Sequence, residues 1–104
     1  MYYRSLDKLI NLYDGYCKVF KVDSHDMMLL QLDGQRYLIE SRCPHREHPL
    51  TRADVQDMTL ICPLHGYRFD LASGALRYHS EEPCRGLKLY ELVYRDNEVG
   101  VMLG

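Results

Sequence analysis

The sequence predicts an all-β fold, a small antiparallel sandwich or barrel, and three observations support this prediction. Short apolar stretches are separated by turn residues such as Asp33-Gly34 and Ser73-Gly74. Residues 67–71 alternate apolar and charged side chains, which is the period of a half-buried strand. Helix signals occur only near residues 5–10 and 51–57, so little helix is expected.

The first expected strands lie in the N-terminal third of the chain. Residues 16–22 are predicted to form one strand. Residues 27–32 and 36–39 are predicted to pair as a hairpin, because Asp33-Gly34 supplies the positive φ that a two-residue turn requires. In the second half, the strand at 67–71 should bury its apolar face and leave its charged side chains outside.

Two further strands are expected near the C-terminus. Residues 87–94 read as one strand, and the last strand should bury every second side chain, namely Val99, Val101 and Leu103. Ser5 is expected to cap one helical turn, and residues 51–57 to hold another. The segment from about Ser41 to Leu60 is expected to be a long irregular loop, and such loops usually carry function.

Composition limits the classes of function. The 104 residues fit a single domain over 1–104, and 13 Lys+Arg against 15 Asp+Glu give a net charge of −2. This balance argues against nucleic acid or an anionic membrane as partner. No apolar run approaches the roughly 20 residues of a membrane helix, and no signal peptide is evident, so a cytoplasmic location is expected. In that reducing compartment, cysteines serve as metal ligands or buried thiols more often than as disulfides.

Four residues form the one pattern with metal-ligand spacing. Cys43 and His45 are separated by one proline, and Cys62 and His65 by Pro-Leu. Thiolate and imidazole are strong ligands for borderline and soft metals, and two short chelates can converge on one ion or cluster. The prolines stiffen both loops where ligand geometry must be held.

These segments, Cys43-Pro44-His45-Arg46 and Cys62-Pro63-Leu64-His65-Gly66-Tyr67-Arg68-Phe69-Asp70, followed by Ser73-Gly74, resemble the Rieske and Rieske-type ferredoxin family. The resemblance implies a Rieske-like antiparallel β-sandwich or barrel with two cluster-binding loops. It also implies one 2Fe-2S cluster, with Cys43 and Cys62 on the inner iron and His45 and His65 on the outer, more exposed iron.

Departures from the pattern indicate the low-potential branch. The quinol-oxidising members carry a bridging cysteine at the positions of His48 and Leu64. They also carry a serine and a tyrosine, whose hydroxyls favour the reduced state, at the positions of Tyr67 and Phe69. Without these features, a potential near the bottom of the roughly −150 to +300 mV range is expected.

The resemblance implies a soluble, monomeric electron carrier that is not an enzyme in its own right. Its expected partners are a flavin-dependent NAD(P)H reductase as donor and an oxygenase of the aromatic-ring-hydroxylating type as acceptor, both bound transiently. An apolar rim around exposed His45 and His65 would suit such docking. Its members are expected to be Pro44, Pro49, Leu50, Pro63, Leu64 and Pro83.

Two alternative functions remain open from the sequence. The chain could be the small Rieske-like subunit of an assimilatory nitrite reductase, or a zinc-stabilised interaction module, since two cysteines and two histidines are also a zinc set. Cys17 and Cys84 are expected to be free thiols. Cys84 lies in a loop that, by the resemblance, could cover the cluster. His48 is expected to be a surface residue, with a role in proton coupling or partner contact as the alternative.

Overall fold

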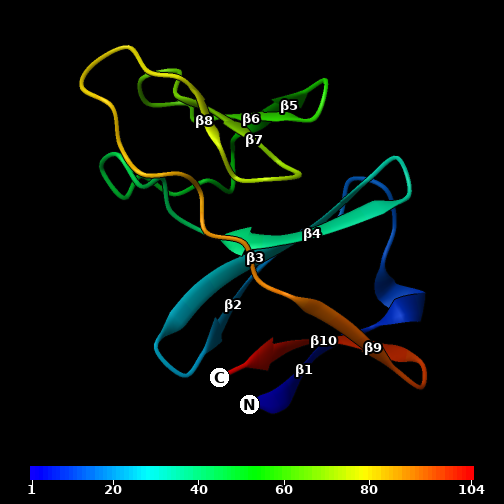
Figure 1. Ribbon diagram of the computed structural model, residues 1–104. Coiled ribbons are helices and arrows are strands. Elements are labelled where there is room, and N and C mark those ends of the chain that lie inside the picture. Colours follow the sequence, from blue (N-terminus) through cyan, green and yellow to red (C-terminus); the bar gives the residue numbers. More distant parts are fainter. The chain divides into compact units, whose positions relative to one another are not determined.

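A computed structural model describes residues 1–104 and contains three antiparallel sheets (Figure 1), which confirms the all-β prediction. The sheet orders are β1-β10-β9, β2-β3-β4 and β5-β6-β7-β8. The elements are β1 (Tyr2–Lys8), the 3-10 turn η1 (Leu9–Asn11), β2 (Cys17–Val22), β3 (His25–Leu32), β4 (Gln35–Glu40), β5 (Asp54–Gln56), β6 (Thr59–Ile61), β7 (Arg68–Asp70), β8 (Leu76–Tyr78), β9 (Leu92–Arg95) and β10 (Glu98–Leu103). No helix here has the length and apolar character needed to cross a membrane.

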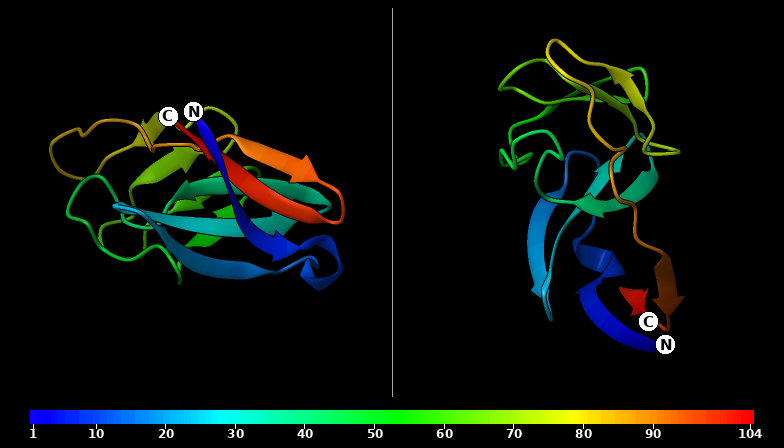
Figure 2. Two further views of the ribbon diagram at one scale, coloured as in Figure 1. Left: turned by 90° about the horizontal axis from the view of Figure 1, so that it is seen from below. Right: turned by 60° about the vertical axis from the view of Figure 1, so that its left-hand side comes forward.

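The chain divides into two compact units, Met1–Ile39 with Tyr90–Gly104, and Glu40–Leu89. In the first unit the predicted hairpin is present as β3 and β4, with φ of 50° at Asp33 and 77° at Gly34. Strand β2 pairs with β3. Strand β10 pairs with both β1 and β9, and strands β1, β10 and β9 lie side by side in both views of Figure 2.

One apolar core holds the first unit together. Its buried members come from both sheets and the loop before β2: Tyr16, Met27, Leu29, Leu38, Val99, Val101 and Leu103. The inward positions predicted for the last strand are therefore confirmed. Burying each aliphatic side chain of this kind contributes about 1.5–3 kcal/mol. The Tyr16 hydroxyl donates a hydrogen bond to Asp7 Oδ2 at 2.6 Å, which satisfies the polar end of the one core tyrosine.

The second unit contains the four-stranded sheet and the two predicted ligand segments. Leu60 on β6 faces Phe69 on β7, and both are buried, whereas Arg68 is exposed, as the alternation predicts. Asp70, also expected outside, is half-buried, with 19% of its side chain exposed. The turn after β7 ends at Gly74, whose φ is 80°. A Cβ on this residue would lie 2.2 Å from the carbonyl oxygen of Leu87, so the close approach of the two backbones requires glycine.

Several predicted elements are wrong. Ser5 lies within β1 and caps no helix, and residues 54–56 form β5 where a helical turn was expected. The expected irregular loop is therefore interrupted by β5 and by the start of β6. Of the predicted strand 87–94, only residues 92–94 belong to a strand, β9. Strand β1 is stabilised by pairing with β10, a distant partner that its own sequence pattern does not reveal.

Candidate metal centre

The first predicted ligand segment forms a closed loop from Cys43 to His48. The Cys43 N–H donates to the His48 carbonyl at 2.8 Å, and the Glu47 N–H donates to the Cys43 carbonyl at 2.7 Å. An antiparallel bridge between Arg42 and Pro49 closes the base of the loop. The loop therefore holds its shape through backbone bonds that do not use the side chains of Cys43 and His45.

The second segment repeats the same backbone pattern. The Cys62 N–H donates to the Tyr67 carbonyl at 2.8 Å, and the Gly66 N–H donates to the Cys62 carbonyl at 3.0 Å. The fifth residue of each loop is left-handed, with φ of 54° at Glu47 and 72° at Gly66. The two loops share one backbone design, and each begins with Cys-Pro.

The two cysteines lie at the buried base of the loops. Cys43 is 1% exposed and Cys62 is 2% exposed. The pKa of the Cys43 thiol is raised to about 11, chiefly by burial and also by the neighbouring Cys62, although the backbone N–H groups of His45 and Arg46 act to lower it. A buried thiol with a raised pKa becomes a thiolate readily only when a cation compensates its charge, so the environment of Cys43 suits metal ligation.

The two histidines lie close together but are unequally exposed. Their ring centroids are 5.4 Å apart, and the side chain of His45 is 6% exposed whereas that of His65 is 36% exposed. The expectation that both are exposed is wrong for His45, because the ring of Tyr67 stacks on it at 4.1 Å with an interplanar angle of 10°. Leu50, expected in the apolar rim, is also buried at 1%.

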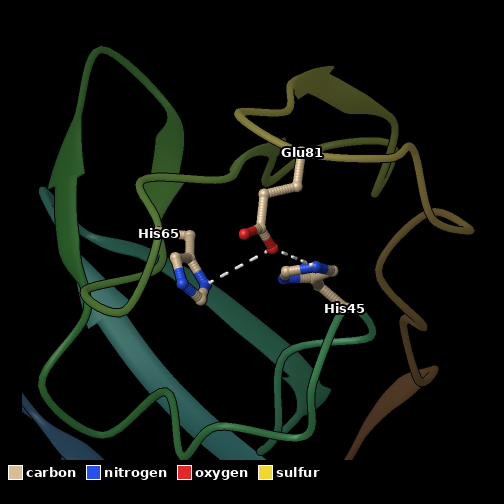
Figure 3. A group of neighbouring side chains, drawn as sticks. All are labelled: His45, His65 and Glu81. Carbon is tan, nitrogen blue, oxygen red and sulfur yellow. Dashed lines mark ion pairs between the residues drawn. The ribbon is translucent and has the colours of Figure 1, made fainter.

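One nitrogen of each histidine is buried without a hydrogen-bond partner, namely His45 Nε2 and His65 Nδ1. Glu81 points between the two imidazoles (Figure 3), and its Oε1 lies 3.1 Å from His45 Nε2 and 3.9 Å from His65 Nδ1. These ion-pair contacts are not aligned as hydrogen bonds. Buried polar atoms without partners are costly, and metal ligation is one way to satisfy them. Two buried thiols with two such imidazoles fit the donor set of a mixed-ligand 2Fe-2S cluster.

Glu81 was not predicted from the sequence. It lies in the segment 79–85, which is joined to the second ligand loop by two hydrogen bonds, one made by the residue before Glu81 and one by the residue after it. The Ser80 hydroxyl donates to the His65 carbonyl at 2.7 Å, and the Tyr67 hydroxyl donates to the Glu82 carbonyl. No sequence motif predicts this placement, because the hydrogen bonds that fix the segment are accepted by backbone carbonyls, which every residue has.

Other predicted residues are placed as follows. The His48 carbonyl accepts the Cys43 N–H, and the residue is half-buried, so this histidine helps to close the first loop through its backbone. Cys17 and Cys84 are free cysteines, as predicted, and burial raises the pKa of both thiols. His25 is half-buried, and its Nδ1 lies 3.3 Å from the Tyr90 hydroxyl.

Comparison with known proteins places these features in a family context. The family model of the Rieske [2Fe-2S] domain matches residues 5–91. The chain is 31% identical over 65 residues to the ferredoxin component of an alkene monooxygenase system from Xanthobacter autotrophicus, covering 62% of this chain and 53% of that protein. It is 38% identical over 48 residues to a 4β-methylsterol monooxygenase from Methylococcus capsulatus, covering 46% of this chain and 13% of that protein.

A solved structure extends the likeness over nearly the whole chain. The ferredoxin of carbazole 1,9a-dioxygenase from Nocardioides aromaticivorans IC177 superposes with a TM-score of 0.78 and 27% sequence identity, covering 95% of each chain. The fold of that ferredoxin therefore resembles the fold of this chain over nearly the whole of both chains.

Proposed function

The chain belongs to the Rieske [2Fe-2S] domain family, and from this we propose that it is a Rieske-type ferredoxin carrying single electrons from a flavin-dependent NAD(P)H reductase to an oxygenase of the aromatic-ring-hydroxylating type. The similarity to ferredoxins of a carbazole dioxygenase and an alkene monooxygenase supports this role. In this proposal the chain acts as a monomer and a single domain in the cytoplasm, and it performs no catalysis of its own.

We propose that one 2Fe-2S cluster binds between the two loops. Cys43 and Cys62 would hold one iron, and His45 and His65 would hold the other. When bound, the cluster supplies a site that accepts and releases one electron. The loops contribute rigidity, because backbone hydrogen bonds close each loop without using the side chains of the proposed ligands. Tyr67 excludes water from one face of His45, and the backbone N–H groups of His45 and Arg46 stabilise negative charge on the Cys43 sulfur.

The exposure of His65 is the observation that carries the electron-transfer role. At 36% exposed, it is the more accessible of the two proposed histidine ligands, so we propose that electrons enter and leave at its edge. Leu64, next to it, is 45% exposed, and Pro63 is also exposed. Together with exposed Pro49 and Pro83, these are the members of the expected apolar rim that remain exposed, and we propose that they contribute to a weak, transient interface.

An electron-transfer assay tests the proposed function. The cluster-loaded chain would be mixed anaerobically with NADH and a catalytic amount of flavin-dependent reductase from a Rieske dioxygenase system. Reduction should partly bleach the visible absorption. Once the NADH is exhausted, addition of an oxidised Rieske oxygenase from the same system should lower the EPR signal of the reduced ferredoxin as the signal of the reduced oxygenase appears. A matched pair of variants, Leu64→Asp and Met58→Asp, separates docking from general surface effects, since both side chains are 45% exposed. Slower transfer for Leu64→Asp alone supports the rim, and no enzymatic reduction of the wild type contradicts the proposed role.

A further inference from the structure

We propose that Glu81 is a positioning residue that lowers the reduction potential of the centre by keeping a carboxylate beside the two imidazoles. This inference rests on the proposed function, because it concerns the cluster that His45 and His65 would hold. No motif of the sequence contains Glu81, and the residue enters only through the geometry of the second unit.

The carboxylate contacts both histidines through one oxygen. Oε1 lies 3.1 Å from His45 Nε2 and 3.9 Å from His65 Nδ1, and the three potential ligand atoms lie within 4.8 Å of one another. Figure 3 shows Glu81 reaching down from its own segment into the space between the two rings. A single charge is thus placed where it acts on both members of the histidine pair.

The backbone on either side of Glu81 is fixed to the second ligand loop. Ser80 donates its hydroxyl to the His65 carbonyl at 2.7 Å, and Glu82 accepts the Tyr67 hydroxyl through its carbonyl. Farther along, Arg85 donates to both carboxylate oxygens of Glu40 at 2.7 and 2.8 Å. The backbone that carries Glu81 is therefore fixed beside the second ligand loop, which keeps its carboxylate near the two histidines.

The electrostatic consequence has a definite sign. Reduction adds one negative charge to the centre, and a nearby carboxylate disfavours that charge. The Arg46 guanidinium lies 3.6 Å from the same Oε1 and offsets part of the effect. Because the side chain of Glu81 is 42% exposed, solvent screens it, and we expect its removal to favour reduction by about tenfold, which equals about 59 mV for a one-electron couple.

Three variants and one control test this inference by redox titration monitored by absorption and EPR, at fixed pH and ionic strength. Glu81→Gln should raise the potential, and Glu81→Asp, which keeps the charge, should stay near the wild-type value. Arg46→Gln should lower the potential, because it removes the compensating cation. The control, Glu82→Gln, removes the same charge one residue away and should shift the potential much less than Glu81→Gln.

The outcomes separate this inference from the proposed function. A wild-type chain that binds no 2Fe-2S cluster contradicts the proposed function itself. A wild-type cluster with equal potentials in Glu81→Gln and Glu82→Gln overturns the role of Glu81 alone. Loss of the cluster in Glu81→Gln, with retention in Glu82→Gln, also overturns it, because Glu81 would then be needed to hold the metal. A raised potential with an unchanged EPR signal supports it.

Discussion

The two ligand loops differ at the one position where each must adopt a left-handed backbone, and this difference predicts opposite effects of two substitutions. Gly66 takes φ of 72° in the second loop, and the equivalent residue of the first loop, Glu47, takes φ of 54°. A residue with a Cβ is less stable by roughly 1–2 kcal/mol when its backbone adopts the left-handed conformation. Glu47→Gly should therefore stabilise the chain, and Gly66→Ala should destabilise it.

The structure allows the size of each effect to be worked out. A Cβ built on Gly66 meets nothing within 4 Å, so the cost of Gly66→Ala is conformational and not steric, and we expect about 1 kcal/mol. The side chain of Glu47 is exposed, so Glu47→Gly relieves backbone strain with little loss of packing and gains up to about 1 kcal/mol. For a domain of this size, 1 kcal/mol corresponds to a change in Tm of roughly 4–8 °C.

Thermal unfolding followed by circular dichroism measures both effects. The variants and the wild type would be loaded with cluster to the same degree and heated at one scan rate, because cluster loss makes unfolding irreversible. We expect Glu47→Gly to have the highest Tm, the wild type an intermediate Tm, and Gly66→Ala the lowest Tm. If Gly66→Ala melts with the wild type, or if Glu47→Gly melts below it, the assignment of equivalent left-handed positions to the two loops is refuted.

Three further predictions concern stability. Tyr67→Phe removes one hydrogen bond to the backbone of segment 79–85 and should lower stability by about 1 kcal/mol while keeping the ring stacked on its histidine, as chemical denaturation would measure. Hydrogen bonds from Asn11 and Tyr16 hold the pKa of Asp7 below its usual 3.8, so the stability they contribute is present above pH 3.8 and is lost as the pH falls through the lowered pKa. The Tm difference between wild type and Asp7→Asn should accordingly shrink on acidification, and a constant difference would contradict this linkage. Gly74→Ala would place a Cβ 2.2 Å from a backbone carbonyl and should destabilise the chain far more than Gly66→Ala, in the same melting assay.

The sequence predicts the features of this fold that depend on local chemistry. The β3–β4 hairpin could be predicted because Asp33-Gly34 sits between two apolar stretches, and the four candidate ligands because their spacing is short and distinctive. Strand β1 could not, since Tyr2 pairs with Leu103 at the other end of the chain. Pairings of that kind are decided by tertiary context and leave only a weak pattern in either strand.

The same limit applies to the candidate centre. The burial of His45 depends on the ring of Tyr67, which reaches it from the second loop. The place of Glu81 depends on the contacts that its neighbours make with residues 15 positions away in sequence. Motif spacing identifies which residues offer ligand atoms, whereas their exposure and their charged neighbours become visible only when the two loops are brought together.

The central claim is that two cysteines and two histidines hold one cluster, and it is tested most directly by EPR of the dithionite-reduced chain, with and without ¹⁵N-labelled histidine. Anaerobic preparations should contain about two irons and two acid-labile sulfides per chain. Pulsed EPR should then resolve couplings to two histidine nitrogens, which His45→Ala or His65→Ala abolishes and His48→Ala leaves unchanged. One zinc per chain with no EPR signal, or a signal without histidine coupling, would contradict the account.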